Sequence, residues 1–521
     1  MTGGARLFSR GFGRVLGLGA GLGLALGLIA QPAMARKASP RQQVEQALLT
    51  HIGILASDDF AGRDPGTDGE ARTLRYIGQQ FFDMGLESGT NDPGHPWFAP
   101  VALVAREPAG SAAQFWRKGR PVAVDPGEWL VLTSGRRSLV ERAPLYFVGR
   151  GRDVPPRAEL AGRVAVLLDK GGEPGAPRGA RQNALLANGA LAVLTVLDGE
   201  RSLNNVAVRR KRSGYALASE ALGGDLEAFL SPAGLAQLLA GSGQALASLE
   251  AEADRSDFAA RPLDISASME ATTRETTIRT HNLIGKIPGR RPETGAVLLL
   301  AHWDHFGICA SPPAEHLICN GAVDNASGVA AMIEIARRLA VPPLAHDRDI
   351  YVLATTAEEL GLLGAEAFAE QPPMPLKNIV AAFNLDSLAI APAGTPLGIV
   401  GKGMTPLDAG IAVVARAQKR RLSDSTAPNQ YIRRQDGWAL MNHDVPAVMV
   451  TSAYGEIGRL EHFFDTDYHR PLDVVKPELE LGGAAEDVLF HVALVNYFAD
   501  ATRWSGTAGQ ASGQGSRPAN P

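Results

Sequence analysis

The sequence is poor in cysteine, with only Cys309 and Cys319 among its 521 residues. Two cysteines so placed give no thiolate-rich metal site of the zinc-finger type. They flank a proline-rich loop that contains Pro312 and Pro313. An oxidising compartment permits such a pair to join, so we expect a disulfide that closes this short loop, with two free thiols as the alternative.

The sequence also lacks an excess of charge of one sign, long apolar runs and internal repeats. Its formal net charge is -4, and no basic run is long enough to indicate nucleic-acid binding. Beyond the first 35 residues, no segment is apolar for long enough to cross a bilayer. We therefore expect a mature chain that is soluble, with no nucleic-acid partner and no stable membrane insertion.

The first 35 residues resemble a secretory signal peptide. Three arginines precede position 15, a stretch rich in Leu, Gly and Ala follows over 15–30, and Ala33-Met34-Ala35 has the small-x-small pattern of a cleavage site. The alternative is an uncleaved membrane anchor, for which the apolar stretch is short and rich in glycine. The sequence thus predicts a periplasmic or secreted protein.

The chain is longer than a single hydrophobic core usually reaches, about 250–300 residues, so two domains are expected. We predict the N-terminal part of a catalytic domain at 40–140, an inserted smaller β-rich domain at 141–265 and the main catalytic region at 275–503. The remaining residues, 504–521, are rich in Gly, Ser, Gln and Pro and predict a disordered tail.

Hydrophobic periodicity predicts the elements of the first half of the chain. Amphipathic helices are expected at 41–56 and 68–86, and short strands within 100–135. In the inserted region the pattern predicts strands at 143–148, 163–168 and 191–197, a helix at 180–190, a half-buried strand at 249–254 and an extended segment at 263–269.

From about residue 275, strands and helices alternate regularly. Strands are expected at 296–301, 349–355, 379–385, 397–400 and 447–451, and helices at 326–339, 362–369, 407–419 and 486–503. Continuous apolar strands separated by helices predict an α/β fold with a mainly parallel twisted sheet and helices on both faces.

Three of these strands are followed directly by side chains that can bind metal. His302 follows the first strand, Glu358 and Glu359 follow the second, and Asp386 follows the third. In open α/β sheets, ligands bind at the carboxyl ends of the strands. The sequence therefore predicts a site at this edge of the sheet.

Two further candidates complete the set. Asp324 precedes a predicted helix, and His469 lies in a loop. With the residues at the strand ends, they give two imidazoles and three carboxylates, a mixture that suits zinc. If two metal ions are held, one carboxylate has to bridge them, since co-catalytic ions lie about 3.5–4 Å apart.

Adjacent carboxylates repel each other unless a cation neutralises one, so we interpret Glu359 as a ligand and Glu358 as a free general base. The alternative is an acidic helix N-terminus. Asp304, two residues after His302, is expected to orient that imidazole and raise its basicity, with a solvated loop aspartate as the alternative.

Several ordered motifs carry a resemblance to a known family. They are His302-x-Asp304, Asp324-Asn325-Ala326-Ser327-Gly328, Glu358-Glu359-x-Gly361-x-x-Gly364, Asn384-x-Asp386 and Tyr468-His469. Together they resemble the co-catalytic zinc exopeptidases, which include aminopeptidase Y, the bacterial leucyl aminopeptidases and the glutamate carboxypeptidases. Residues 55–67 and 282–289 are similar to further segments of that family, and 143–262 resembles, more weakly, an inserted protease-associated domain.

The resemblance implies two zinc ions per chain and a role for each candidate. Asp324 would bridge both ions, His302 and Asp386 would bind one, and Glu359 and His469 the other. Glu358 would be the base. Tyr468 resembles the residue that stabilises the oxyanion in some members, with a packing aromatic as the alternative.

The chain departs from the family's pattern at Arg434-Gln435-Asp436-Gly437-Trp438, where relatives often have Ser-Asp-His. Asp436 can keep the acidic position, and the histidine is missing. Arg433 and Arg434 are either a grip for a substrate carboxylate or a solvated pair. The extra histidines His305, His316, His443 and His462 are expected in loop or packing roles.

The sequence thus predicts an exported zinc aminopeptidase acting on peptide substrates. A carboxypeptidase or dipeptidase on the same scaffold is the main alternative. A glutaminyl cyclase would need one zinc only, and a non-catalytic receptor would have lost ligands that this chain retains.

Overall fold

The structure is a computed structural model that describes residues 38–95, 97–169, 179–198, 201–212, 214–220, 223–342 and 346–506. The expected signal peptide at 1–35 and most of the expected tail at 504–521 lie outside these ranges. Within them, no helix is long and apolar enough to cross a membrane.

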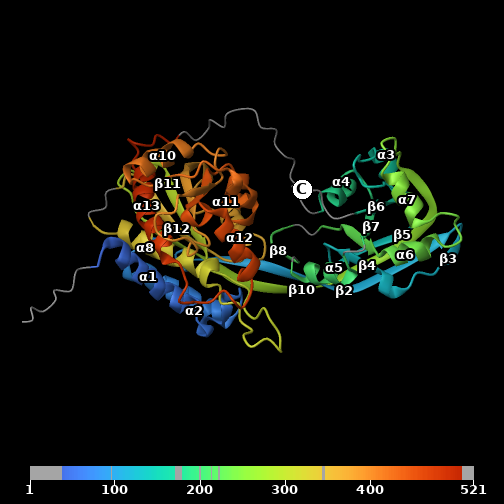
Figure 1. Ribbon diagram of the computed structural model, residues 1–521, viewed down its shortest axis with the longest axis horizontal. Helices are drawn as coiled ribbons and strands as arrows, with labels where there is room; N and C mark the ends of the chain where they lie inside the picture. Colours follow the sequence, from blue (N-terminus) through green and yellow to red (C-terminus); the bar gives the residue numbers. More distant parts are fainter. Residues whose placement is uncertain are drawn as a thin grey trace, which may run out of the picture. The chain divides into compact units, whose positions relative to one another are not determined.

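The predicted parallel sheet is present. Strands β11 (Ala296–His302), β12 (Asp349–Thr355), β13 (Ile379–Asn384) and β15 (Ala447–Thr451) run parallel in the order β15-β13-β11-β12 (Figure 1). Strand β14 (Gly398–Val400) is antiparallel beside β15. Every residue of β11 is buried, as expected for a strand covered on both faces.

Helices cover both faces of this sheet. Alternate residues of β11, such as Val297 and Leu299, pack with α1 (Pro40–Leu55), α8 (Gly328–Leu339) and α13 (Leu481–Ala499). Leu298 and Leu300 point the other way and share a core with α9 (Leu363–Glu370) and α11 (Gly437–Asn442). The predicted α/β fold class is therefore confirmed.

A second core lies in the region predicted as an insertion. Strands β5 (Arg137–Phe147), β6 (Val164–Leu168), β7 (Ala192–Val196), β9 (Leu226–Leu230) and β4 (Trp129–Thr133) follow one another in the sheet. Their buried residues form a separate apolar cluster. The domain boundaries, and the likeness to a protease-associated domain, stay predictions.

One long strand, β10 (Arg261–Ile287), joins the two regions. Its early residues pair with β5, its last residues pair with β12, and most of its length pairs with β2 (Phe98–Arg117). The sequence predicted only short strands in 100–135 and a short extended segment at 263–269. Their true length is set by pairing between segments more than 140 residues apart, which local periodicity does not contain.

The strand predicted at 249–254 is wrong, because this segment lies in α7 (Leu246–Ala253). Its alternating apolar and acidic residues suit a strand, but Ala, Leu and Glu are strong helix formers. The helix buries Leu249 and Ala253, which are four residues apart and therefore share one face.

The other elements mostly match the predicted ones or are short connections. They are α2 (Asp68–Asp83), β1 (Glu87–Ser88), β3 (Arg120–Val122), α3 (Arg157–Leu160), α4 (Ala180–Ala187), α5 (Leu203–Arg212), β8 (Tyr215–Leu217), α6 (Pro232–Leu239), α10 (Asp408–Ala417) and α12 (Ile457–Thr466). Short helical turns at Asp58–Arg63, Ala322–Ser327 and Ala427–Arg434 border the site. The predicted disulfide between Cys309 and Cys319 is present.

Candidate metal centre

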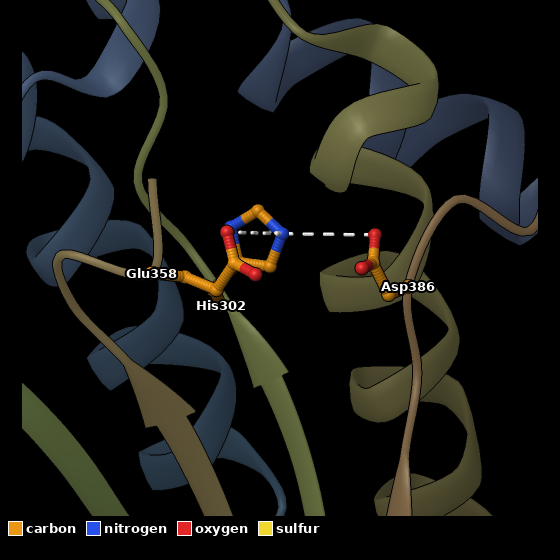
Figure 2. Close-up of side chains that lie close together, drawn as sticks. All are labelled: His302, Glu358 and Asp386. Atoms are coloured by element: carbon orange, nitrogen blue, oxygen red, sulfur yellow. Dashed lines mark ion pairs between the residues drawn. The ribbon is translucent and has the colours of Figure 1, made fainter. Parts of the chain in front are cut away.

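The strand ends bring the predicted metal-binding side chains together. His302 is the last residue of β11, Glu358 and Glu359 follow β12, and Asp386 follows β13. Since these strands are parallel, their carboxyl ends lie at one edge of the sheet. Figure 2 shows the carboxylates of Glu358 and Asp386 beside the imidazole of His302, with both ion pairs ending on its Nε2.

Two imidazole nitrogens face carboxylate oxygens across short gaps. Nε2 of His302 lies 3.4 Å from Oδ1 of Asp324, 3.6 Å from Oδ1 of Asp386 and 4.0 Å from Oε2 of Glu358. Nε2 of His469 lies 3.2 Å from Oδ2 of Asp324 and 3.0 Å from Oε2 of Glu359. Asp324 thus turns a different oxygen toward each imidazole.

These distances suit a tetrahedral metal ion. Zinc bonds of about 2.0–2.2 Å place neighbouring donor atoms of a tetrahedron about 3.3–3.6 Å apart. In the part of the chain that the structure describes, Nε2 of His302, Nε2 of His469 and Oδ2 of Asp324 are buried without a hydrogen-bond partner. Buried polar atoms normally have a hydrogen-bond partner, so the absence of one indicates that these atoms are placed to bind a metal ion.

Among the described residues, two overlapping sets of donor atoms lie close enough together to hold a metal ion. One set contains His302, Glu358 and Asp386, and the other contains His302, Asp324 and Glu359, with the atoms of each set within 4.8 Å of one another. The donor set therefore fits one metal ion or a pair of them.

The electrostatics of the site reflect an excess of buried negative charge. Burial would lower the pKa of His302, but the carboxylates of Glu358, Asp324 and Asp386 raise that pKa well above its ordinary value. Against its own burial, the carboxylates around His469 raise its pKa to about 9. Such a site favours a cation, since unpaired buried charges are costly.

The two glutamates differ in their surroundings. Burial, together with the neighbouring charge of Glu359, raises the pKa of Glu358 well above its ordinary value. Burial would also raise the pKa of Glu359, but the imidazoles of His305 and His469 lower it. Glu359 is therefore held as a carboxylate, and Glu358 accepts a proton readily.

Asp304 acts on this pair of glutamates. Its carboxylate accepts the backbone N–H of Glu358 at 3.1 Å and of Glu359 at 3.4 Å. The same carboxylate lies 3.8 Å from Nδ1 of His302, whereas the backbone oxygen of Asp304 lies 3.3 Å from that nitrogen. A carbonyl oxygen only accepts, so Nδ1 carries the proton and Nε2 keeps its lone pair for a metal.

Three residues for which the sequence predicted no role at the metal site hold the site in place. Nδ1 of His305, expected in a loop or packing role, lies 2.6 Å from Oε1 of Glu359. Asp473 accepts the backbone N–H groups of Val323 and Asp324 at 2.9 and 3.0 Å. The buried guanidinium of Arg63 donates to four backbone oxygens, those of Leu55, Trp303, Asn320 and Gly321.

The other expected residues lie around this centre. The ring of Tyr468 stacks on His469 with centroids 3.6 Å apart. Asp436 is buried and accepts a hydrogen bond from Thr355. The remaining extra histidines are in peripheral positions: His316 lies beside Asp58, His443 beside Glu366, and His462 is exposed.

Backbone strain gathers at the same place. Ala357, Ser387 and His469 have φ of 53°, 55° and 57°, a left-handed conformation that side chains disfavour. Each is a candidate ligand or neighbours one of the residues at the strand ends. Strain of this kind concentrates at functional sites, where surrounding contacts hold it.

The chain is similar to several known proteins. Residues 282–492 match the family model described as Peptidase family M28. The chain is 34% identical over 125 residues to aminopeptidase YwaD of Bacillus subtilis, which covers 24% of each protein. It is 30% identical over 129 residues to the alkaline phosphatase isozyme conversion protein of Escherichia coli, covering 23% of this chain and 36% of that protein. The matched stretches thus span about a third or less of these relatives.

Solved structures give a broader likeness at low identity. The aminopeptidase from Aneurinibacillus sp. strain AM-1 aligns with a TM-score of 0.49 and 19% identity, covering 88% of this chain and 96% of that one. The zinc aminopeptidase BSAP from Bacillus subtilis gives a TM-score of 0.43 and 17% identity over the same shares. The resemblance predicted from the motifs is confirmed by the family match: residues 282–492, which carry all of the candidate metal ligands, match the model of peptidase family M28.

Proposed function

We propose that the chain is an exported zinc aminopeptidase that removes N-terminal residues from peptides with two zinc ions per chain. One observation carries the two-ion proposal. The carboxylate of Asp324 presents Oδ1 to His302 and Oδ2 to His469, at 3.4 and 3.2 Å. This is the arrangement that a bridging carboxylate requires.

The remaining ligands divide between the two positions. Asp386 lies beside His302, and Glu359 lies beside His469. Asp324 with His302 and Asp386 would hold one ion, and Asp324 with Glu359 and His469 the other. When bound, such ions polarise a scissile carbonyl and lower the pKa of water.

Glu358 is the proposed general base. Its Oε2 lies 4.0 Å from Nε2 of His302, farther than the carboxylate oxygens of Asp324 and Asp386. The carboxylate is therefore left to take a proton from the attacking water and to deliver it to the leaving amine. Asp304 supports this role, because its two oxygens fix the backbone of Glu358 and Glu359.

Tyr468 is the proposed donor to the developing oxyanion. Burial, with the charges of Asp324 and Glu359, raises the pKa of its hydroxyl well above the ordinary value. The phenol therefore keeps its proton and can donate it in a hydrogen bond. Its stacking on His469 keeps it beside the metal centre.

The function is tested by a panel of aminoacyl fluorogenic substrates, measured with and without a chelator. We expect hydrolysis that stops on metal removal and returns with zinc. Glu358→Gln should lower kcat about 10²–10⁴-fold, with two zinc ions per chain retained by elemental analysis.

Other outcomes separate the alternatives. Hydrolysis of peptides blocked at the amino end but free at the carboxyl end would identify a carboxypeptidase. Cyclisation of N-terminal glutamine with one bound zinc would identify a glutaminyl cyclase. Full turnover by Glu358→Gln at unchanged metal content would refute the proposed base.

A further inference from the structure

Beside the metal centre, the side chain of Arg434 lies against three aromatic rings. Its guanidinium carbon is 5.9 Å from the ring centroid of Tyr431, 5.1 Å from that of Phe464 and 5.4 Å from that of Tyr468. Cation–π contacts of this kind attract the guanidinium without using its N–H groups as hydrogen-bond donors to a carboxylate. Those N–H groups stay available to bind a ligand.

The arginine is connected to the metal centre through Tyr468. The ring of that tyrosine lies against Arg434 on one side and stacks on His469, one of the proposed ligands. The guanidinium therefore belongs to the rim of the proposed active site.

No anion of the protein neutralises this cation within the described ranges. Among those residues, no carboxylate oxygen lies within 4.0 Å of a nitrogen of Arg434, and the side chain is exposed. Its neighbour Arg433 is also exposed, but it lies over the single ring of Trp438. The buried Arg63, in contrast, donates hydrogen bonds from its N–H groups to backbone oxygens.

We propose that Arg434 selects substrates that carry a carboxylate within one residue of the scissile bond. A guanidinium presents paired N–H donors that match a carboxylate in two parallel hydrogen bonds. The carboxylate has two possible sources: an acidic side chain on the N-terminal residue, or the free carboxyl end of a dipeptide. This proposal rests on the proposed peptidase function and adds a substrate class to it.

The competing explanation is a structural one. Arg434 ends the helical turn Ala427–Arg434, whereas Phe464 belongs to α12 and Tyr468 follows it. In this explanation, Arg434 only stabilises the packing of these segments. Its loss would then lower kcat/KM for all substrates alike, whereas the loss of a carboxylate-binding residue changes the ratio of kcat/KM between charged and neutral substrates.

The test compares matched pairs of substrates in the zinc-loaded full chain. Glu-p-nitroanilide against Gln-p-nitroanilide reports on a side-chain carboxylate, and Leu-Gly against Leu-glycinamide reports on a free carboxyl end. We expect kcat/KM to favour the charged member of one pair by about 10–100-fold, as a charge-assisted hydrogen bond of ~1.5–3 kcal/mol gives. In Arg434→Gln that ratio should fall to about 1.

Two further variants make the result specific. Arg434→Lys keeps the charge but loses the paired geometry, so it should retain part of the preference. Arg433→Gln removes an adjacent exposed arginine of the same type and should retain all of it. The proposal would be overturned if the wild-type chain showed no preference for the charged substrate in either pair. It would also be overturned if Arg434→Gln kept the wild-type ratio of kcat/KM between charged and neutral substrates.

Binding separates this proposal from the peptidase function. In Glu358→Gln, calorimetry of the same pairs measures the preference without turnover, and the double variant with Arg434→Gln should lose it. If the wild type hydrolyses no member of the panel but this binding preference is found, the peptidase proposal fails and the role of Arg434 stands. If the wild type hydrolyses the substrates but neither kinetics nor calorimetry shows a preference for the charged members, the proposed role of Arg434 is refuted and the peptidase proposal stands.

Discussion

At the scale of single residues, the candidate bridging carboxylate depends on a partner that is not itself a ligand. Asp473 accepts the N–H groups of Val323 and Asp324. In Asp473→Asn, one acceptor oxygen becomes an amide donor, which opposes a backbone N–H. Because such supporting contacts orient metal ligands, we expect zinc affinity to fall about 10–100-fold, as measured by competition with a fluorescent chelator.

The exposed Asp465, eight residues earlier, provides the matched control. Asp465→Asn removes the same charge from the same region and should leave zinc affinity unchanged. Equal affinity in Asp473→Asn and the wild-type chain would show that Asp324 holds its position without this contact.

The site could be predicted only in part from the sequence, for a physical reason. His302, Glu359 and Asp386 stand out because they directly follow apolar strands whose carboxyl ends share one edge. The contacts of Arg63 join residues up to 258 positions apart. No local pattern encodes such contacts, and the same holds for the hydrogen bond of His305 to Glu359.

At the scale of elements, α8 buries an acidic residue on its core face. The side chain of Glu334 is 2% exposed, accepts two hydrogen bonds of 2.8 Å from Arg337 and lies 3.9 Å from His51 of α1. Burial would raise the pKa of Glu334, but the hydrogen bonds from Arg337 and the nearby imidazole of His51 lower it to about 2.

This shift gives the stability of the fold a defined pH dependence. The pKa of Glu334 in the folded chain is below its ordinary value of 4.5, so the unfolded chain binds more protons. The stabilisation is then present above about pH 4.5 and is lost as the pH falls toward 2. We expect Glu334→Gln to lower the free energy of unfolding by about 2 kcal/mol at pH 7 and by roughly half of that or less near pH 3, in urea denaturation.

The pair of Arg41 and Glu45 on α1 is the control, since both side chains are partly exposed. Exposed pairs contribute roughly 0–1 kcal/mol, so Glu45→Gln should change little at either pH. A loss in Glu334→Gln that is the same at pH 3 and pH 7 would contradict the proposed ionisation.

The elements themselves were predictable to different degrees. The sequence predicts strands buried on both faces, such as β11 and β12, within one or two residues of their observed bounds. Such a strand is a continuous apolar run, which stands out clearly from the neighbouring sequence. The segment of α7 was misread, because apolar and acidic residues alternate over only six positions there. Two residues per strand period and 3.6 per helix turn are hard to distinguish over so short a stretch.

At the scale of the whole molecule, the proposed metal ions link segments that are far apart in the chain. The ligands come from the ends of β11 and β13, the segment after β12, the turn before α8 and the loop after α12. Without a cation, their buried carboxylates repel one another. Zinc at 1,000 times its dissociation constant would stabilise the folded chain by about 4.1 kcal/mol.

We therefore expect a chelator to lower the melting temperature by several degrees in calorimetry, since 1 kcal/mol corresponds to about 2–4 °C in a domain of 150–250 residues. Asp324→Asn weakens the proposed bridge between the ions and should lose most of this chelator-dependent shift. Glu358→Gln alters a residue that is proposed not to bind metal, so its shift should match that of the wild type. If the shift is lost in Glu358→Gln and kept in Asp324→Asn, the roles of these two carboxylates are reversed.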